Sequence, residues 1–176
     1  MNQISERNPF WDFSLSHYDN PEVVKCCLGL QDNYGLSVNM LLYSLWLAIR
    51  HKCLDMASLD QQQALRQCRE EVLAPLRSAR YAMKRIGMSV GRPRLYSDLK
   101  QLELEVENVE QKLLFRLTQS MPDSGLPQRR LALQNLNAYW YSLRPQSEPV
   151  PAEAEQLLQL VLGEREENVF FTGNRE

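Results

Sequence analysis

The chain has 176 residues, 44% of them hydrophobic and 24% charged, which suffices for one domain with a real core and excludes a disordered chain. Glycine is scarce, with 7 residues, whereas Leu, Gln, Glu and Arg, which favour helix, are abundant. The net charge is −2, and no alternating run of β-branched residues predicts a strand. We expect an all-α, single-domain bundle of about six to seven helices over residues 1–163, followed by a charged, flexible tail over residues 164–176.

The first residues contain no basic segment followed by an apolar one, the pattern of a secretion signal. No apolar run reaches the ~20 residues that a membrane-spanning helix needs. Cys26 and Cys27 are adjacent, and Cys53 and Cys68 lack the spacing of a metal-binding pair. We therefore expect a cytoplasmic protein with reduced, buried thiols and no cofactor, and we keep a redox or metal role for the cysteines as the alternative.

Two start signals precede the first two predicted helices. Asn8 and Asn20 are good N-caps, and each is followed by a proline at the first helical position. The helix over residues 10–18 is crowded with aromatic side chains, so it is expected to lie across the bundle as a lid. The second helix is expected over residues 21–33, and Gly35 suits the left-handed conformation that ends a helix.

The third predicted helix, near residues 36–51, is apolar on almost every face. A regular core-facing stripe runs through Val38, Leu41, Leu42, Leu45, Trp46 and Ile49. Further apolar residues lie off this stripe, and such a helix is stable in water only when other helices surround it. We expect it to be the buried central helix of the bundle.

The next two predicted helices are amphipathic in different ways. A helix that starts at a Ser58 cap, and that Pro75 is expected to kink or divide, carries an apolar stripe beside a basic stripe. A loop is predicted at residues 87–93. The helix after it carries a heptad seam, an apolar row with alternating steps of four and three residues: Leu95, Leu99, Leu102, Val106, Val109 and Leu113. We expect this seam to pack lengthwise on another helix, with Glu103, Glu105, Glu107 and Glu110 outside.

The remainder of the chain predicts two more helices and a tail. A break at residues 121–127 precedes a helix over residues 128–143, and a proline-rich stretch separates it from an amphipathic helix at about residues 152–162. Phe170 and Phe171 stand in the polar tail. They either dock back on the body or form a short motif that binds a partner.

The motifs of common enzymes are absent in a usable context. The chain has neither the zinc-binding H-E-x-x-H and C-x-x-C patterns nor the glycine-rich loops that hold phosphates. The letters G-M-S-V-G at residues 87–91 fit the G-x-S-x-G pattern of hydrolases, but they fall in the predicted loop between two helices and follow no predicted strand, so they do not form the strand-to-helix turn of these enzymes. Its two histidines, His17 and His51, are interpreted as a packed ring and as a residue at a helix C-terminus. We predict no catalytic residue and no metal site.

Two groups of polar residues remain as candidate sites. Asp12, Gln31, Asp32 and Asn39 lie within the apolar N-terminal half, and they form either a polar clasp between the first three helices or the lining of a small pocket. The basic stripe between residues 66 and 100 includes Arg69, Arg77, Arg80, Lys84 and Arg85. It can bind an acidic protein partner, bind nucleic acid, or pair within the fold with the glutamates that follow.

The sequence F-W-D-F-S-L-S-H-Y-D-N-P-E-V, followed by C-L-G-L-Q-D-N-Y-G-L-S-V-N-M-L-L-Y-S-L-W-L-A, resembles an uncharacterised family of small proteobacterial proteins. The resemblance is specific over residues 9–48 and looser over residues 72–84, where relatives have a more uniformly basic run that Tyr81 and Met83 interrupt. The region after Gly163 has no counterpart. The resemblance implies a helical fold in a bacterial cytoplasm and transfers no functional residue.

These patterns favour a non-catalytic protein that acts through protein–protein interaction, with the basic stripe, Phe170 and Phe171 as candidate contacts. The first alternative is a helical enzyme or small-ligand binder with a pocket beneath the aromatic lid. The second is nucleic-acid binding through the basic stripe. The sequence leaves the oligomeric state open.

Overall fold

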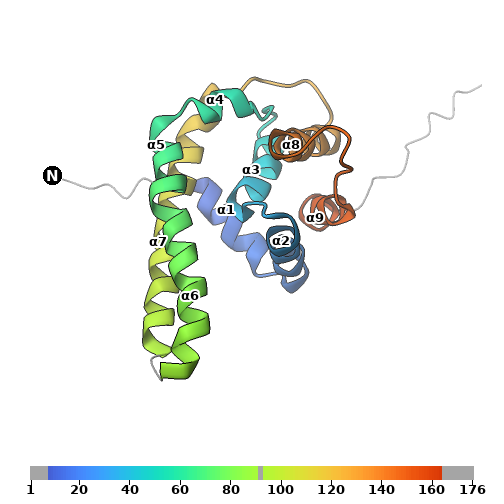
Figure 1. Cartoon of the computed structure of the whole chain (residues 1–176). Helices are drawn as coiled ribbons and strands as arrows, with labels where there is room; N and C mark the ends of the chain where they lie inside the picture. Colours follow the sequence, from blue (N-terminus) through green and yellow to red (C-terminus); the bar gives the residue numbers. More distant parts are fainter. Residues whose placement is uncertain (1–7, 91–92, 164–176) are drawn as a thin grey trace, which may run out of the picture.

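The computed structural model of the chain describes residues 8–90 and 93–163, and within these ranges the fold is all-α (Figure 1). Its elements are α1 (Pro9–Tyr18), α2 (Pro21–Tyr34), α3 (Val38–Ile49), α4 (Met56–Asp60), α5 (Gln63–Gln67), the π-helix η1 (Cys68–Leu73), α6 (Ala74–Val90), α7 (Pro93–Leu117), the 3₁₀ turn η2 (Thr118–Ser120), α8 (Gln128–Leu143) and α9 (Ala152–Leu162). None of the helices in these ranges is long and apolar enough to span a membrane.

The helices form a body and a projecting hairpin. In the body, α3 packs along α8, while α1, α2 and α9 complete the surrounding layer. In the hairpin, α5, η1 and α6 follow one another as one long rod, and α7 returns beside this rod toward the body (Figure 1). Most of α6 and the first half of α7 therefore extend beyond the body (Figure 1). In this part of the hairpin, each helix packs on the other with one face, and its other faces are open to solvent.

The central helix was predicted correctly. Every residue of α3 from Asn39 to Ala48 is buried, because α1, α2, α7 and α8 all contact it. Asn135 of α8 supports its C-terminal end, donating to the carbonyl oxygens of Ser44 and Lys52 over 3.1 and 3.0 Å. A buried amide that satisfies backbone groups in this way fixes where the helix ends.

The predicted start and stop signals at the N-terminus are confirmed. The side chain of Asn8 accepts a hydrogen bond from the Trp11 backbone N–H, and Asn20 caps α2 in the same manner. Gly35 ends α2 with φ of +70°, a conformation that is unstrained for glycine. The aromatic lid is confirmed as well, because Phe13 of α1 packs with its ring centroid 5.4 Å from that of Trp46 in α3.

The start of the next helix differs from the prediction. Asp55, not Ser58, is the N-cap: it accepts hydrogen bonds from the Ser58 backbone N–H at 3.1 Å and from the Ser58 hydroxyl at 2.6 Å. These bonds lower the pKa of Asp55 below its usual value. A carboxylate accepts both donors at once, and it is favoured at the positive end of a helix.

Pro75 perturbs the long rod as expected, through a π-helix rather than a sharp kink. Proline lacks the N–H that would continue the hydrogen-bond ladder, and η1 directly precedes it. A π-helix contains more residues per turn than an α-helix, so the apolar stripe changes direction as it passes through. Leu65, before the π-helix, and Cys68, its first residue, are buried, whereas Leu76 and Met83, after it, are half-buried.

Candidate functional site

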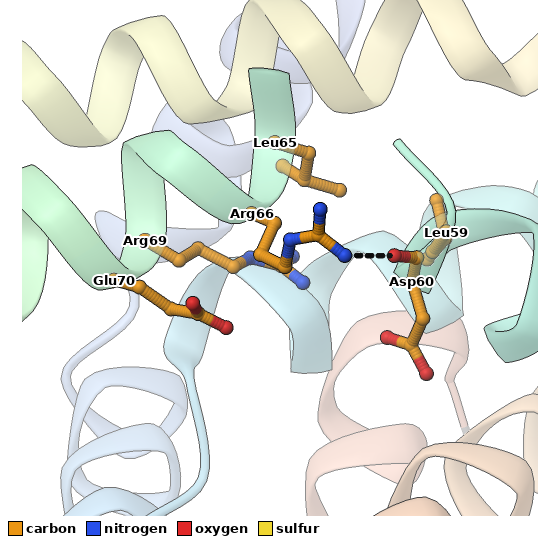
Figure 2. A pocket seen from close by; sticks show the side chains of 6 residues that line it. All are labelled: Leu59, Asp60, Leu65, Arg66, Arg69 and Glu70. Atoms are coloured by element: carbon orange, nitrogen blue, oxygen red, sulfur yellow. Dashed lines mark hydrogen bonds between the residues drawn. The ribbon is translucent and has the colours of Figure 1, made fainter. Parts of the chain in front are cut away.

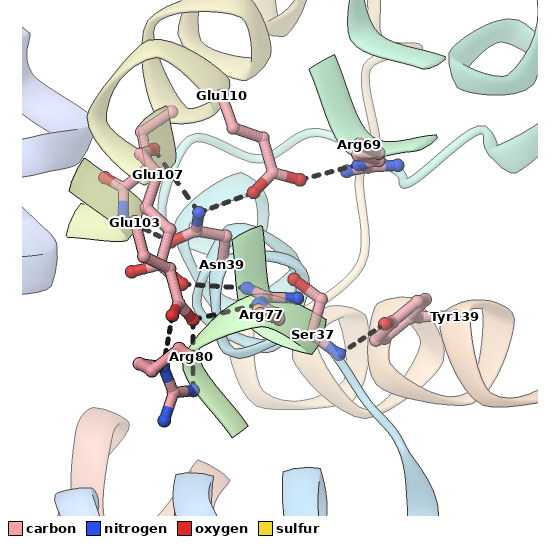
Figure 3. A network of polar contacts seen from close by, with 10 residues as sticks. Ser37, Asn39, Arg69, Arg77, Arg80, Glu103, Glu107, Glu110 and Tyr139 are labelled. Carbon is pink, nitrogen blue, oxygen red and sulfur yellow. Dashed lines mark hydrogen bonds and ion pairs between the residues drawn. The ribbon is translucent and has the colours of Figure 1, made fainter. Parts of the chain in front are cut away.

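The contact between the two arms of the hairpin is made by arginines of the rod and glutamates of α7 (Figure 3). Arg77 donates to Glu103 over 3.2 Å and to Glu107 over 2.7 Å. Arg80 forms two hydrogen bonds with the same Glu103 carboxylate. The basic stripe that the sequence predicts therefore faces an acidic stripe on the neighbouring helix.

A third arginine joins this contact at the base of the hairpin. Arg69, in the π-helix, pairs with Glu110 at 2.6 Å, and the Glu110 side chain is only 1% exposed. A buried carboxylate is stable as an anion only when it is paired and hydrogen-bonded. Internal pairing, one of the alternatives open at the level of sequence, is thus the arrangement that the structure shows for Arg69, Arg77 and Arg80.

The charged contact shifts the ionisation of its members. Burial raises the pKa of Glu107, although its hydrogen bond with Arg77 acts in the opposite direction. The hydrogen bond to Glu103 raises the pKa of Arg80, so this guanidinium remains charged. These shifts come from burial and pairing inside the hairpin, and they need no catalytic explanation.

The pairing continues into the body as a buried polar network. Asn39 of α3 donates to Glu110 over 2.6 Å and accepts from the Gln111 amide over 2.7 Å. Ser14 of α1 in turn donates to Gln111 over 3.2 Å. Asn39 is therefore part of a clasp, as one interpretation of the sequence has it, but this clasp joins α1 and α3 to α7.

The other members of the predicted polar set lie elsewhere. Asp12 and Asp32 are at the surface, and Gln31 is half-buried in the last turn of α2. The structure does not bring them together with Asn39. The polar partners of Asn39 come from a helix about seventy residues further along the chain, and no local pattern in the sequence identifies them.

Two depressions on the described part of the chain are candidate ligand sites. One, of about 210 Å³, lies beside the π-helix and is lined by Leu59, Asp60, Leu65, Arg66, Arg69 and Glu70 (Figure 2). The other, of about 410 Å³, is a shallow surface along α9. Neither is lined by Asp12, Asp32 or Asn39, the residues of the predicted pocket.

The depression beside the π-helix has a balanced set of charges. Arg66 and Arg69 line it together with the carboxylates of Asp60 and Glu70, and Arg66 also donates to the Asp60 carbonyl oxygen over 3.5 Å (Figure 2). The Nη2 atom of Arg69 is buried and has no hydrogen-bond partner. The paired charges favour neither an anion nor a cation, so this depression does not define a ligand class.

For the remaining candidate residues, the role in binding a partner stays a prediction. Lys84 and Arg85 are exposed on the outer half of α6. Phe170 and Phe171 lie outside the described residues. Among the described residues, no group of three or more His, Cys, Asp and Glu side chains is placed to hold a metal ion.

The heptad seam of α7 is not where the sequence places it. Glu103, Glu107 and Glu110 face the rod, although they were predicted to lie outside, and the apolar seam lies to one side of that contact. Leu95, Leu102 and Val109 are 44%, 48% and 48% exposed, while Leu99, Val106 and Leu113 are half-buried. The arginines of the rod turn the glutamates inward, because each buried pair requires its partner.

The seam of α7 and the apolar stripe of α6 lie on the same side of the hairpin. In α6, Leu76 and Ala79 directly precede Arg77 and Arg80; in α7, Leu102, Val106 and Val109 directly precede Glu103, Glu107 and Glu110. Each apolar row is thus turned by about 100° from its charged row, in the same sense. Because the helices are antiparallel and their charged rows face each other, the two apolar rows lie next to each other on the same side of the hairpin.

We call this surface the apolar flank. Its members are Leu76, Ala79 and Met83 of α6 and Leu95, Leu99, Leu102, Val106, Val109 and Leu113 of α7. The body lies on the other side of α7, where Gln111 contacts Ser14 and Asn39. The sequence contains the signal for this arrangement, an arginine row and a glutamate row of matching spacing on consecutive helices, but each row was predicted separately.

The fold and its surface define an all-α protein with a projecting helical hairpin. Residues 9–114 match the model of a family described as a protein of unknown function (DUF2390), and the chain belongs to this family. The match extends from α1 through most of α7 and includes the apolar flank. It confirms the resemblance to an uncharacterised family. No curated protein and no solved structure matches the chain significantly.

Proposed function

We propose that this chain is a non-catalytic bacterial protein of the cytoplasm that acts by binding another protein through the apolar flank of its hairpin. The observation that carries this proposal is the exposure of the flank: three of its large apolar side chains are 44–48% exposed on a helix that projects from the body. Contiguous exposed apolar surface on a soluble protein is typical of an interaction site.

The chemistry of three of the four cysteines supports a non-catalytic role. Burial raises the pKa of Cys27 to about 12 and also raises the pKa values of Cys26 and Cys68. A thiol with a raised pKa is a poor nucleophile at neutral pH. The Nδ1 atom of His17 lies 2.8 Å from the Phe13 carbonyl oxygen, a contact within its own helix.

The internal pairing of the arginines favours an apolar partner over an acidic one. Nucleic acids and acidic proteins are recognised by basic groups that are free to face them. Arg69, Arg77 and Arg80 instead face glutamates of the same chain, with Glu103 and Glu110 buried. The apolar flank remains open for a partner, and Lys84 and Arg85 are exposed on the same hairpin.

The proposal is tested by site-specific photo-crosslinking in cells of the organism that carries the gene. A photoreactive amino acid replaces Leu102, on the flank, or Leu104, which is 46% exposed and lies about 200° around the same helix. We expect a discrete crosslinked protein product from position 102 and none from position 104. Equal products from both positions, or no product from either, would contradict the proposal.

A further inference from the structure

We propose that the apolar flank binds the apolar flank of a second copy of this chain, with the two hairpins antiparallel. This inference rests on the proposed function, since it names the partner of the same surface. Its basis is the order of the side chains along the flank, which matches itself when one copy is reversed against the other. An interface between identical chains related by a two-fold axis requires this self-complementarity.

The match is complete along α7. When two seams are placed antiparallel with residue 104 at the level of the two-fold axis, Leu95 lies opposite Leu113 of the second copy. Leu99 then lies opposite Val109, and Leu102 opposite Val106. Each pair brings together one half-buried and one exposed side chain, so the exposed rows fill the spaces beside the half-buried ones, as knobs fill holes in a coiled coil.

The apolar row on α6 also matches a reversed copy of itself, about a point at nearly the same level along the hairpin as the centre of the α7 seam. The bonds of Glu103 to both Arg77 and Arg80 place Ala79 level with the centre of the α7 seam. Reversal about the level between residues 79 and 80 puts Leu76 opposite Met83 of the second copy, and the two Ala79 residues then lie within one residue of each other in height. A small residue at the centre lets the two α6 helices approach closely, while the larger pairs pack on either side.

Two of the three charged positions at the outer edge of the seam support the same antiparallel arrangement. Asp98, Glu105 and Lys112 follow this edge at intervals of seven residues, on the side away from α6. Reversal about residue 104 places Asp98 opposite residue 110 of the second copy, two residues from Lys112 and within reach of its long side chain, twice in the dimer. Glu105 comes close to its own copy near the centre, and this single like-charge contact opposes the two opposite-charge contacts. Asp98 is 3.9 Å from Arg94 within the chain, and both side chains are largely exposed, so this contact leaves Asp98 accessible.

Two reversed hairpins on each other form a four-helix arrangement, a common way to bury helices that have one apolar side. The apolar stretch of α7 from residue 95 to residue 113 is about 27 Å long at ~1.5 Å per residue. In the pairing, the tip of each hairpin reaches toward the base of the other. Both bodies remain on the outer sides, because each body contacts α7 through Gln111, away from the flank.

The test measures the oligomeric state of the full-length chain by sedimentation velocity over a range of concentrations. We expect a concentration-dependent dimer for the wild type. Leu102→Glu places a charge in each half of the apolar contact and should weaken the dimer about 100-fold or more. Leu104→Glu is the matched control and should dimerise as the wild type does. Both substitutions are at exposed positions, and circular dichroism should show that both variants are folded.

The antiparallel register has a separate test. Asp98→Lys alone and Lys112→Asp alone each place like charges together, and each should weaken the dimer several-fold. The double variant restores opposite charges and should recover the wild-type association. A wild type that stays monomeric at every concentration, equal loss in Leu104→Glu and Leu102→Glu, or no recovery in the double variant would overturn the inference.

These results are distinguishable from a failure of the proposed function. If the wild type is monomeric and position 102 crosslinks to a different protein in cells, the second copy is the wrong partner while the flank remains an interaction surface. If the wild type is monomeric and position 102 crosslinks to nothing, both proposals are wrong.

Discussion

Asn39 is the residue at which the body and the hairpin are joined. Its amide both donates to Glu110 and accepts from Gln111, so one side chain uses its two polar ends on two consecutive residues of α7. It is 6% exposed, in the first turn of a mostly apolar helix. A polar group so buried is tolerated because its partners satisfy it.

We expect Asn39→Ala to lower the free energy of unfolding by about 1–3 kcal/mol, because the Gln111 amide loses its acceptor and Glu110 loses a donor in a buried environment. Asp32→Ala is the matched variant from the same predicted polar set. Asp32 is exposed, so its replacement should change the free energy by no more than about 0.5 kcal/mol. Urea unfolding followed by circular dichroism measures the free energy of unfolding of both variants. If Asp32→Ala lowered it as much as Asn39→Ala, Asp32 would be part of the polar clasp and this account of the clasp would be wrong.

At the residue scale, the sequence was informative where a local rule applies. Asn8, Asn20 and Gly35 were assigned correctly, because an N-cap or a left-handed cap is decided by a few neighbouring residues. Asn39 was singled out as a polar interruption, yet its partners depend on which face α7 turns toward α3. That choice is made by tertiary contacts, which a local pattern does not contain.

The orientation of α7 shows how two patterns on one helix compete. Its leucines and valines follow a heptad rule that normally marks the buried side. Its glutamates follow the same spacing one residue later, and they match three arginines of the preceding rod. In the structure, the charged row packs against the rod and the apolar row lies to the side of this contact. The sequence therefore predicted correctly that the apolar residues share one side of α7, but it was wrong that this side packs on another helix of the chain.

If the charged row holds the hairpin together, Glu110→Gln should destabilise the protein by about 2 kcal/mol or more. The amide keeps the shape of the side chain and removes the charge opposite Arg69, which is 26% exposed, so we expect less than the roughly 3–5 kcal/mol lost when a fully buried pair is broken.

Glu105→Gln is the control for this prediction, because Glu105 is an exposed glutamate on the same helix. Its replacement should change the free energy of unfolding by no more than about 0.5 kcal/mol. Thermal unfolding of the two variants gives the comparison. A Glu110→Gln protein as stable as Glu105→Gln would show that the ion pairs contribute little to the hairpin.

At the scale of the whole molecule, the sequence predicted the all-α class, the central helix and the position of the last helix, because each depends on composition or on strong periodicity. The division into a body and a projecting hairpin was not predicted. It follows from the matching of two charged rows across a turn, and it leaves the apolar flank exposed on the far side from the body. The predicted interaction surface therefore moves from the arginines to the apolar row beside them.

Hydroxyl-radical footprinting of the full-length chain tests the central claim, that the apolar flank is covered by a protein partner, most directly. Oxidation of Leu102 and Leu104, which are 48% and 46% exposed on opposite sides of α7, is compared between dilute purified protein and living cells. We predict that oxidation of Leu102 falls in cells relative to the dilute protein, while oxidation of Leu104 is unchanged. Oxidation that changes equally at the two leucines, or falls only at Leu104, would contradict the account.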